Sequence, residues 1–174
     1  MPTEAPYSSR LYQPSLHNAR PFACGEPGLD AWLQKKATEA ARARVAQTFA
    51  WVDDGPEPDL VVAYYALSAH AIPRVEAPSR IGRGVPDPVP AALIGKLALD
   101  QRLHGQGLGE VLLVDALQRI ADASTQGPAV RAILVDAATD AGRRLYARFG
   151  FVPSPNRPDR MLIRTETVMK ALRG

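Results

Sequence analysis

The chain has 174 residues, of which 46% are hydrophobic, and it carries a net charge of +3 and a single cysteine. A chain of this length can bury one sizeable core, so we expect a single domain over residues 1–174. No apolar run approaches the ~20 residues that span a bilayer, and residues 1–6 lack the apolar segment of a signal peptide, so we expect a cytoplasmic protein with no membrane contact. One cysteine excludes an internal disulfide, and three scattered histidines predict no bound metal.

The N-terminal part predicts a strand followed by a helix. Residues 12–16 are the candidate first strand. Residues 29–44 place apolar side chains at helical spacing, which is typical of an amphipathic helix, and the region of Asp30 supplies its cap.

Two strands and a long loop are predicted next. The apolar stretches 47–52 and 59–69 flank the turn-forming residues 53–58, so we expect two strands with a hairpin-like connection. The segment 73–90 is rich in proline and glycine and cannot form a regular helix. We expect a surface loop there, ordered or mobile, and a candidate substrate lid.

The second half alternates strands and helices. The apolar stretch 91–99 predicts a strand, residues 108–121 a helix, and residues 131–137 a buried strand after the Gly127–Pro128 break. A further helix begins after Thr139 or Asp140 and stops at Gly150. The tail predicts a last strand over 161–165 and a short helix over 166–172.

The glycine-rich run 102–109 lies where the strand ends and the helix begins. Its three alternating glycines allow positive φ angles, and the helix start adds unpaired N–H groups, so the turn is suited to hold an anion. A nucleotide P-loop needs Gly-Lys-Ser/Thr, whereas Leu108 follows Gly107 here. The dinucleotide fingerprint has a different glycine spacing and lies early in the chain. An ordinary glycine turn that caps a helix is the remaining alternative.

The spacing Arg-x-x-Gly-x-Gly, formed by Arg102, Gly105 and Gly107, resembles the acyl-CoA pyrophosphate loop of the GNAT family of N-acetyltransferases. Downstream, Tyr146-x-x-Phe149-Gly150-Phe151 resembles a second motif of that family. The resemblance implies a mixed α/β (α+β) fold with a central, mostly antiparallel sheet of six to seven strands. This sheet would be splayed at the acyl-CoA site and flanked by helices.

Within this family the chain looks like the GNAT toxins of bacterial toxin–antitoxin pairs, over nearly its whole length. The stretches that carry this resemblance are 24–33, 63–67, 86–90, 95–100 and 150–154. The resemblance implies acetylation of the α-amino group of aminoacyl-tRNA, which blocks translation. It also implies a ribbon-helix-helix antitoxin as partner and a homodimer. Lys96 departs from the arginine that is commoner at its position, which keeps the charge but loses the fork-shaped donor set.

Acetyl transfer from a thioester needs a bound donor, a polarised carbonyl, a neutral amine and a proton for the departing thiolate. The strand end can hold the pantetheine arm through its backbone, and the N–H of Leu99 can stabilise the oxyanion. The helix start would hold the pyrophosphate, and His104 lies beside phosphate or faces solvent. The expected acetyl-CoA contacts are Leu97, Ala98, Leu99, His104, Gly105, Gln106, Gly107, Leu108, Gly109 and Glu110.

Tyr146 is the candidate general acid, because a phenol with a reference pKa of ~10 stays protonated at neutral pH. Packing is the alternative for a tyrosine on a helix, and the resemblance favours the general acid. Tyr64 and Tyr65 are rival hydroxyls, of which at least one should pack in the sheet. Cys24 is expected to pack rather than to act as a nucleophile.

No carboxylate or histidine stands out as a general base, which favours a substrate amine that loses its proton easily. An α-amine has a reference pKa of ~7.7 to 8.0, against ~10.4 for a lysine side chain. We therefore expect direct attack by the aminoacyl α-amine, with water removing its proton.

Arginine outnumbers lysine, and several basic residues suggest a polyanionic substrate. Each of them alone could simply be solvated. The candidate tRNA contacts are Lys36, Arg42, Arg44, Arg80, Arg83, Lys96 and Arg148. Two other functions stay open: an N-acetyltransferase of a small-molecule or protein amine, and a non-catalytic acyl-CoA-binding or DNA-regulatory partner.

Overall fold

The structure is a computed structural model, and it describes residues 7–53 and 55–174. The expectation about a signal peptide in residues 1–6, and Asp54 of the predicted turn, lie outside the described residues. The strands are β1 (Ser9–Leu11), β2 (Gln47–Asp53), β3 (Leu60–Ile72), β4 (Val89–Leu99), β5 (Ala132–Asp136), β6 (Val152–Pro153) and β7 (Arg160–Arg164). The helices are α1 (Pro27–Lys35), α2 (Ala37–Arg42), α3 (Ser79–Gly82), α4 (Leu108–Gln126), α5 (Asp140–Arg148) and α6 (Thr165–Arg173), with short 3₁₀ turns η1 (Arg74–Glu76) and η2 (Gln101–Leu103).

The strands are hydrogen-bonded in the order β1-β2-β3-β4-β5-β7-β6. The pair β4–β5 is parallel, and its register runs from Ala91–Ala132 to Ile94–Val135. The pairs β1–β2, β2–β3, β5–β7 and β6–β7 are antiparallel. The expected fold class, a mixed and mostly antiparallel sheet flanked by helices, is therefore confirmed, as is the hairpin-like connection of β2 to β3.

The chain folds into two compact units. The first comprises the described residues up to Ser68 together with Gly95–Ala116, and the second comprises Ala69–Ile94 and Leu117–Gly174. The chain passes from one unit to the other inside β3, β4 and α4, not through a linker. That residues 1–174 act as a single domain stays a prediction.

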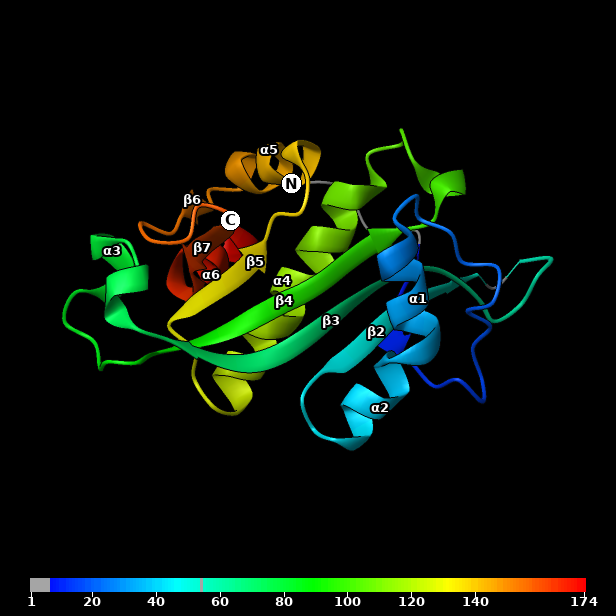
Figure 1. Cartoon of the computed structure of the whole chain (residues 1–174), viewed down its shortest axis with the longest axis horizontal. Coiled ribbons are helices and arrows are strands. Elements are labelled where there is room, and N and C mark those ends of the chain that lie inside the picture. Colours follow the sequence, from blue (N-terminus) through cyan, green and yellow to red (C-terminus); the bar gives the residue numbers. More distant parts are fainter. Residues whose placement is uncertain (1–6, 54) are drawn as a thin grey trace. The chain divides into compact units, whose positions relative to one another are not determined.

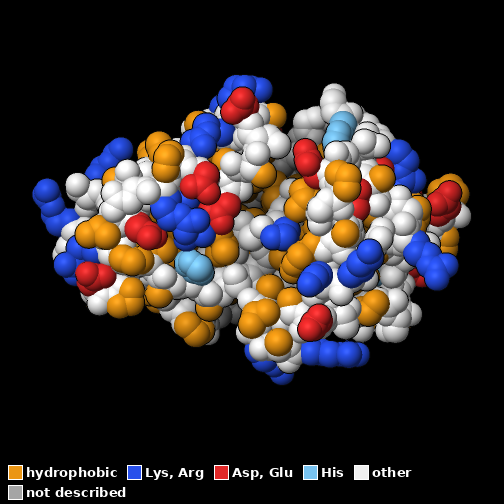
Figure 2. All heavy atoms as spheres, viewed as in Figure 1, with side chains coloured by type: hydrophobic (Ala, Val, Ile, Leu, Met, Phe, Trp, Pro, Cys, Tyr) orange, Lys and Arg blue, Asp and Glu red, His pale blue; other side chains and the backbone are white. Residues whose placement is uncertain are grey.

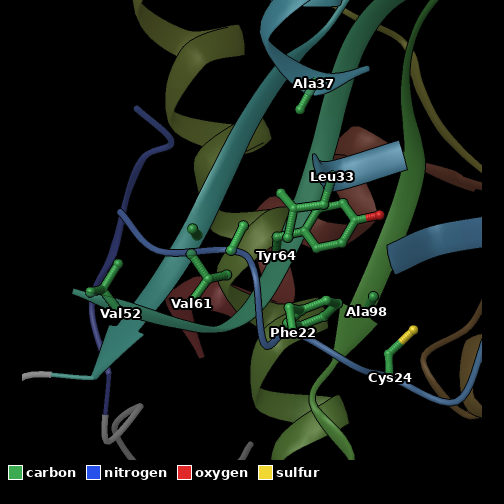
Figure 3. Packing of buried hydrophobic residues seen from close by; sticks show 10 residues of the cluster. Phe22, Cys24, Leu33, Ala37, Val52, Val61, Tyr64 and Ala98 are labelled. Carbon is green, nitrogen blue, oxygen red and sulfur yellow. The ribbon is translucent and has the colours of Figure 1, made fainter. Parts of the chain in front are cut away.

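The first unit has its own buried core, which Figure 3 shows from close by. Leu33 of α1 and Ala37 of α2 pack with Tyr64 of β3, and the Phe22 ring lies 5.5 Å from the Tyr64 ring in an edge-on contact. Both helices therefore cover one side of β2 and β3 (Figure 1). The indole N–H of Trp51 donates to Asp115 of α4 at 2.9 Å, which ties α4 to β2.

The predicted helix over 29–44 is two helices, α1 and α2, which meet at Lys36. The backbone of Lys36 has φ −117° and ψ −27°, and this change of direction brings Ala37 into the core at 1% exposure. The helix begins earlier than predicted because Pro27 fits the first helical position, where no N–H is needed. The Asp30 carboxylate accepts a hydrogen bond from the Cys24 backbone N–H at 2.9 Å, just before the helix.

The prediction of a strand over 12–16 is wrong, because β1 ends at Leu11 and residues 14–16 form a turn. Pro14 has no N–H to donate to a sheet. The turn closes through the His17 N–H, which donates to the Gln13 carbonyl at 2.9 Å. In return the Gln13 N–H donates to His17 Nδ1 at 3.1 Å.

In the second unit the segment 73–90 is ordered. It forms η1 and α3, and Ile81 of α3 packs into the buried core of this unit. Ser154 donates its hydroxyl to the Glu76 carbonyl at 2.6 Å, and Arg131 Nε donates to the Ile81 carbonyl at 3.1 Å. These contacts join the segment to the rest of the second unit, and a role of the segment as a substrate lid stays a prediction.

The C-terminal elements lie close to where they were predicted. Thr139 caps α5, because its hydroxyl accepts a hydrogen bond from the Gly142 N–H at 3.0 Å. Gly150 has φ +95° and ends the segment, as a C-terminal glycine should. Strand β6 was not predicted, since two residues carry no periodic pattern. No helix in residues 7–53 or 55–174 combines the length and the apolar character needed to cross a membrane.

Candidate active site

The glycine turn lies between β4 and α4 in the first unit. Gly105 and Gly107 have φ +77° and +75°, in the left-handed region that glycine favours. A Cβ added at Gly105, Gly107 or Gly109 would meet nothing within 4 Å. In the described part of the chain, the N–H groups of Gly105, Gln106 and Gly107 have no hydrogen-bond acceptor. Uncovered, unpaired amides at a helix start form a site for an anion, and so fit the diphosphate of acetyl-CoA.

Asp100 holds the base of this turn, and sequence reasoning missed it. Its side chain is 3% exposed and accepts hydrogen bonds from the Ala23 N–H (3.2 Å), the Arg102 N–H (3.0 Å) and Arg102 Nε (2.8 Å). Burial alone would raise the pKa of Asp100, but the hydrogen bonds from Arg102 and Ala23 outweigh it, so the pKa is lowered. Arg102 of the motif therefore shapes the turn through Asp100.

The strand residues predicted to contact acetyl-CoA run directly into the turn. Ala98 is buried in the core of the first unit, whereas Leu97 and Leu99 are half-buried. His104 is exposed, and its Nε2 lies 2.7 Å from the Leu99 carbonyl. A carbonyl only accepts hydrogen bonds, so Nε2 carries the proton and donates it. Leu108, Gly109 and Glu110 form the first turn of α4.

Lys96 lies on β4 and is held in place by two contacts. Its Nζ lies 5.5 Å from the centre of the Trp32 ring and donates to the Gly95 carbonyl at 3.2 Å. The Trp32 ring stacks on Tyr64, with centroids 6.0 Å apart and planes 5° apart. Lys96 is thus a fixed cation above a pair of stacked aromatic rings.

Tyr146 belongs to the second unit and lies on α5. Its side chain is 8% exposed, and its ring centroid lies 5.7 Å from that of Phe151. Burial, and to a lesser extent the negative charge of Asp136, raise the pKa of Tyr146 to about 12. The phenol is therefore protonated at neutral pH, as a general acid requires.

Asp136, Arg160 and His70 form a polar cluster in the second unit that sequence reasoning also missed. Arg160 is 5% exposed and binds the Asp136 carboxylate with two hydrogen bonds, of 2.8 and 3.0 Å. These bonds lower the pKa of Asp136, against the effect of burial. Arg160 also donates to His70 Nε2 at 3.3 Å, since a guanidinium has no acceptor. Burial and the charge of Arg160 lower the pKa of His70, so this imidazole is neutral with its Nε2 lone pair engaged.

The rival nucleophiles and hydroxyls have structural partners. Tyr64 and Tyr65 are fully buried. The Tyr64 hydroxyl donates to the Leu29 carbonyl at 2.7 Å, and the Tyr65 hydroxyl lies 3.2 Å from the Ser9 hydroxyl. Cys24 is buried, and burial together with Asp30 raises the pKa of its thiol to about 11. The expectations that at least one of these tyrosines packs in the sheet and that Cys24 packs in the core are confirmed, and both tyrosines are buried.

The candidate tRNA contacts occur in both units. Lys36 lies at the α1–α2 junction, Arg42 in the last turn of α2, and Arg44 just after it. In the second unit Arg80 lies on α3, Arg83 follows it, and Arg148 ends α5. All six are exposed. Figure 2 shows basic and acidic side chains intermixed on the face it displays, and the role of these residues stays a prediction.

No protein-family model matches the chain. The tRNA-acetylating toxin of Mycobacterium tuberculosis is 38% identical over 142 residues, which cover 82% of each chain. A probable toxin TacT of Sinorhizobium fredii is 34% identical over 163 residues, which cover 89% of each chain. Among solved structures, AtaT complexed with acetyl-methionyl-tRNA aligns with a TM-score of 0.85 and 21% identity, covering 95% of this chain and 98% of AtaT.

Among the residues that the structure describes, no group of three or more His, Cys, Asp or Glu side chains is arranged to hold a metal ion.

Proposed function

This chain belongs to the GNAT family of tRNA-acetylating toxins, and on that premise we propose that it transfers acetyl from acetyl-CoA to the α-amino group of an aminoacyl-tRNA. The chain is thus an acetyl-CoA-dependent N-acetyltransferase. The proposal rests mainly on one observation. The backbone N–H groups of Gly105, Gln106 and Gly107, in the turn between β4 and α4, have no hydrogen-bond acceptor among the described residues. Amides in this arrangement bind a diphosphate without a lysine or a metal.

The structural neighbours support the same substrates. One AtaT structure contains acetyl-methionyl-tRNA, and another contains acetyl-CoA together with the C-terminus of the antitoxin AtaR. The second aligns with this chain with a TM-score of 0.80 and 20% identity. We therefore propose that a ribbon-helix-helix antitoxin neutralises this chain, and that the chain acts in the cytoplasm as a homodimer.

The strand end and the turn bind and polarise the acyl donor in this proposal. The Leu97–Leu99 backbone lies along the pantetheine arm, and the turn amides hold the diphosphate. The Leu99 N–H donates to the thioester oxygen as negative charge develops on it. The hydrogen bond from His104 to the Leu99 carbonyl supports this role, because it fixes the peptide that follows that N–H.

Tyr146 acts as the general acid. The substrate amine forms a C–N bond to the acetyl carbon, the C–S bond breaks, and the phenolic proton of Tyr146 passes to the departing thiolate. Solvent then returns a proton to the tyrosinate. The phenol is fully protonated at neutral pH both at the ordinary pKa of ~10 and at the raised value of about 12, so it has a proton to donate. Solved structures also include tyrosine-to-phenylalanine mutants of KacT and AtaT.

The amine itself needs no strong base. The Nε2 lone pair of His70 accepts a hydrogen bond from Arg160, so it is not available to take a proton from the amine. An α-amine with a reference pKa of ~7.7 to 8.0 is already partly neutral at pH 7, whereas a lysine amine at ~10.4 costs about 3.5 kcal/mol more to deprotonate. Water can remove the proton of the α-amine, which favours the aminoacyl group over a lysine side chain as substrate.

The experiment supplies radiolabelled acetyl-CoA with charged tRNA, the same tRNA without its amino acid, or the free amino acid. We expect label in the charged tRNA alone, and a rate that falls steeply with salt, because several phosphates contribute to binding. Equal labelling of free amines would favour a small-molecule or protein acetyltransferase. Binding of acetyl-CoA with no transfer to any amine would favour a non-catalytic partner.

A further inference from the structure

A pocket of about 180 Å³ in the second unit contains neither Tyr146 nor any residue of the glycine turn. Segments from α3, the turn before β6, β6, β7 and α6 form its walls. Its floor is apolar, with Ile81, Val152 and Leu162, and its polar lining comes from Arg80, Arg164 and Thr167. We call it the Arg80–Arg164 pocket.

The two arginines of this pocket lack counterions. No Asp or Glu lines it, and neither Arg80 nor Arg164 forms an ion pair with any residue that the structure describes. The Nε–H of Arg164 is buried and has no hydrogen-bond partner there. The pocket therefore contains two positive charges that no acidic side chain of its lining offsets, and an anion with acceptor oxygens would match them.

The walls of the pocket are held in fixed positions. Arg164 lies in the β5–β7 ladder opposite Ala132, and Arg131 Nε anchors α3 through the Ile81 carbonyl at 3.1 Å. Thr167 lies in the first turn of α6, a nine-residue helix whose N-terminus has no side-chain cap. The hydroxyl of Thr167 and the positive end of the helix add to the attraction of an anion.

We propose that the Arg80–Arg164 pocket binds a terminal phosphate monoester, a group that the 5′ end of a tRNA and a free nucleoside monophosphate share. That the phosphate belongs to the 5′ end of a tRNA rests on the proposed function. A phosphate within a nucleic-acid chain carries one charge and continues on both sides, so it fits a surface better than a pocket. A terminal monoester enters end-on, with three free oxygens and a charge of about −1.5 to −2 that two arginines match.

The first arm of the test compares one uncharged tRNA with a 5′-phosphate or a 5′-hydroxyl, by fluorescence anisotropy at constant salt. We expect the wild-type protein to lose roughly tenfold in affinity when the phosphate is removed, as for the loss of a charge-assisted hydrogen bond. The variants Arg80→Gln and Arg164→Gln should bind both RNAs equally. Arg173→Gln, which removes an exposed charge from the other end of α6, should still discriminate between them.

The second arm titrates adenosine monophosphate into the wild-type protein and the same variants by calorimetry. Binding that Arg80→Gln and Arg164→Gln abolish, with no discrimination between RNA ends, would assign the pocket to a free nucleotide. The proposal is overturned if neither probe distinguishes the wild type from these variants, or if Arg173→Gln has the same effect as they do. Arg80 is exposed, so its variant tests the proposal even if Arg164→Gln fails to fold.

The binding assays use uncharged RNA, so their outcome is independent of acetyl transfer. If the wild-type protein recognises the 5′-phosphate but acetylates no charged tRNA, the phosphate-binding proposal stands and the proposed function is refuted. If it acetylates charged tRNA but binds neither phosphate probe in this pocket, the proposed function stands and the phosphate-binding proposal is refuted.

Discussion

At the scale of single residues, the hydroxyl of Tyr146 carries the proposed proton transfer. Tyr146→Phe keeps the buried ring beside Phe151 and removes only the proton donor. We expect kcat to fall roughly a hundredfold or more, with the affinity for acetyl-CoA unchanged, because general acid catalysis contributes about 10²–10⁴-fold. Rapid-quench kinetics with labelled acetyl-CoA measures the change.

Tyr65→Phe is the matched control for this substitution. Its hydroxyl is also buried, but its partner is Ser9 on β1. We expect this variant to lose about 1 kcal/mol of stability and no transfer rate. Full activity of Tyr146→Phe, or an equal loss in both variants, would contradict the assignment.

The raised pKa of Tyr146 gives a second prediction, on pH. A general acid works while it is protonated, that is, below its pKa of about 12. The rate should therefore rise through the titration of the substrate α-amine at ~7.7 to 8.0 and then stay level. Single-turnover transfer from pH 6 to about pH 9.5, corrected for ester hydrolysis, tests this pattern. A decline within that range would show that the acid has an unperturbed or lowered pKa.

At the scale of elements, the glycine turn combines positive φ angles with uncovered amides. Gly107→Ala should weaken coenzyme A binding several-fold, because a side chain at φ +75° strains the turn and moves its amides. Gly84→Ala is the matched control, since Gly84 has φ +74° and equally open space but lies in the second unit after α3. Both variants should lose about 1 kcal/mol of stability. Calorimetry with coenzyme A should separate them, and equal affinities would refute the turn as the binding site.

Asp100 joins the glycine turn to the segment before α1 through Ala23, so its substitution should lower the free energy of unfolding. Asp100→Asn should cost about 2 kcal/mol near pH 7, because the donors of Arg102 and Ala23 lose a buried, charged acceptor. The folded-state pKa of Asp100 is lowered, so its stabilisation is present above ~3.9 and is lost as pH falls through the folded value. Urea unfolding at several pH values should show the two proteins converging in acid, and a constant gap would contradict this.

The sequence predicted the elements where local signals were strong. Thr139 and Gly150 bound α5 because capping depends on neighbouring residues alone. The break at Lys36 was missed because the apolar spacing continues across it, and only the packing of Ala37 requires the change of direction. The strand over 12–16 was placed wrongly because the turn there depends on the side chain of His17.

The candidate site was predictable to a similar extent. The glycine turn and Tyr146 are local motifs, so their residues could be named from the sequence. The pair Asp136–Arg160 joins two strands across the β5–β7 register, and the unpaired Arg164 depends on which segments surround it. Such contacts between distant residues leave no local pattern in the sequence. The one local signal was Asp136, a charged residue at the end of an otherwise apolar strand.

At the scale of the whole molecule, each of the two units has its own buried core, and both contribute residues to the proposed function. The first contains the glycine turn and Lys96, and the second contains Tyr146 and the Arg80–Arg164 pocket. The candidate RNA contacts are likewise divided between the units. Binding of tRNA should therefore depend on many weak phosphate contacts, and its affinity should fall steeply with salt.

The identity of the acetylated atom tests the central claim most directly. The protein is incubated with acetyl-CoA and charged tRNA, the aminoacyl ester is then hydrolysed, and the released amino acid is analysed by mass spectrometry. We expect an amino acid that carries one acetyl group on its α-nitrogen. Release of coenzyme A with an unmodified amino acid, or acetyl found on the nucleotides or on the protein, would contradict it.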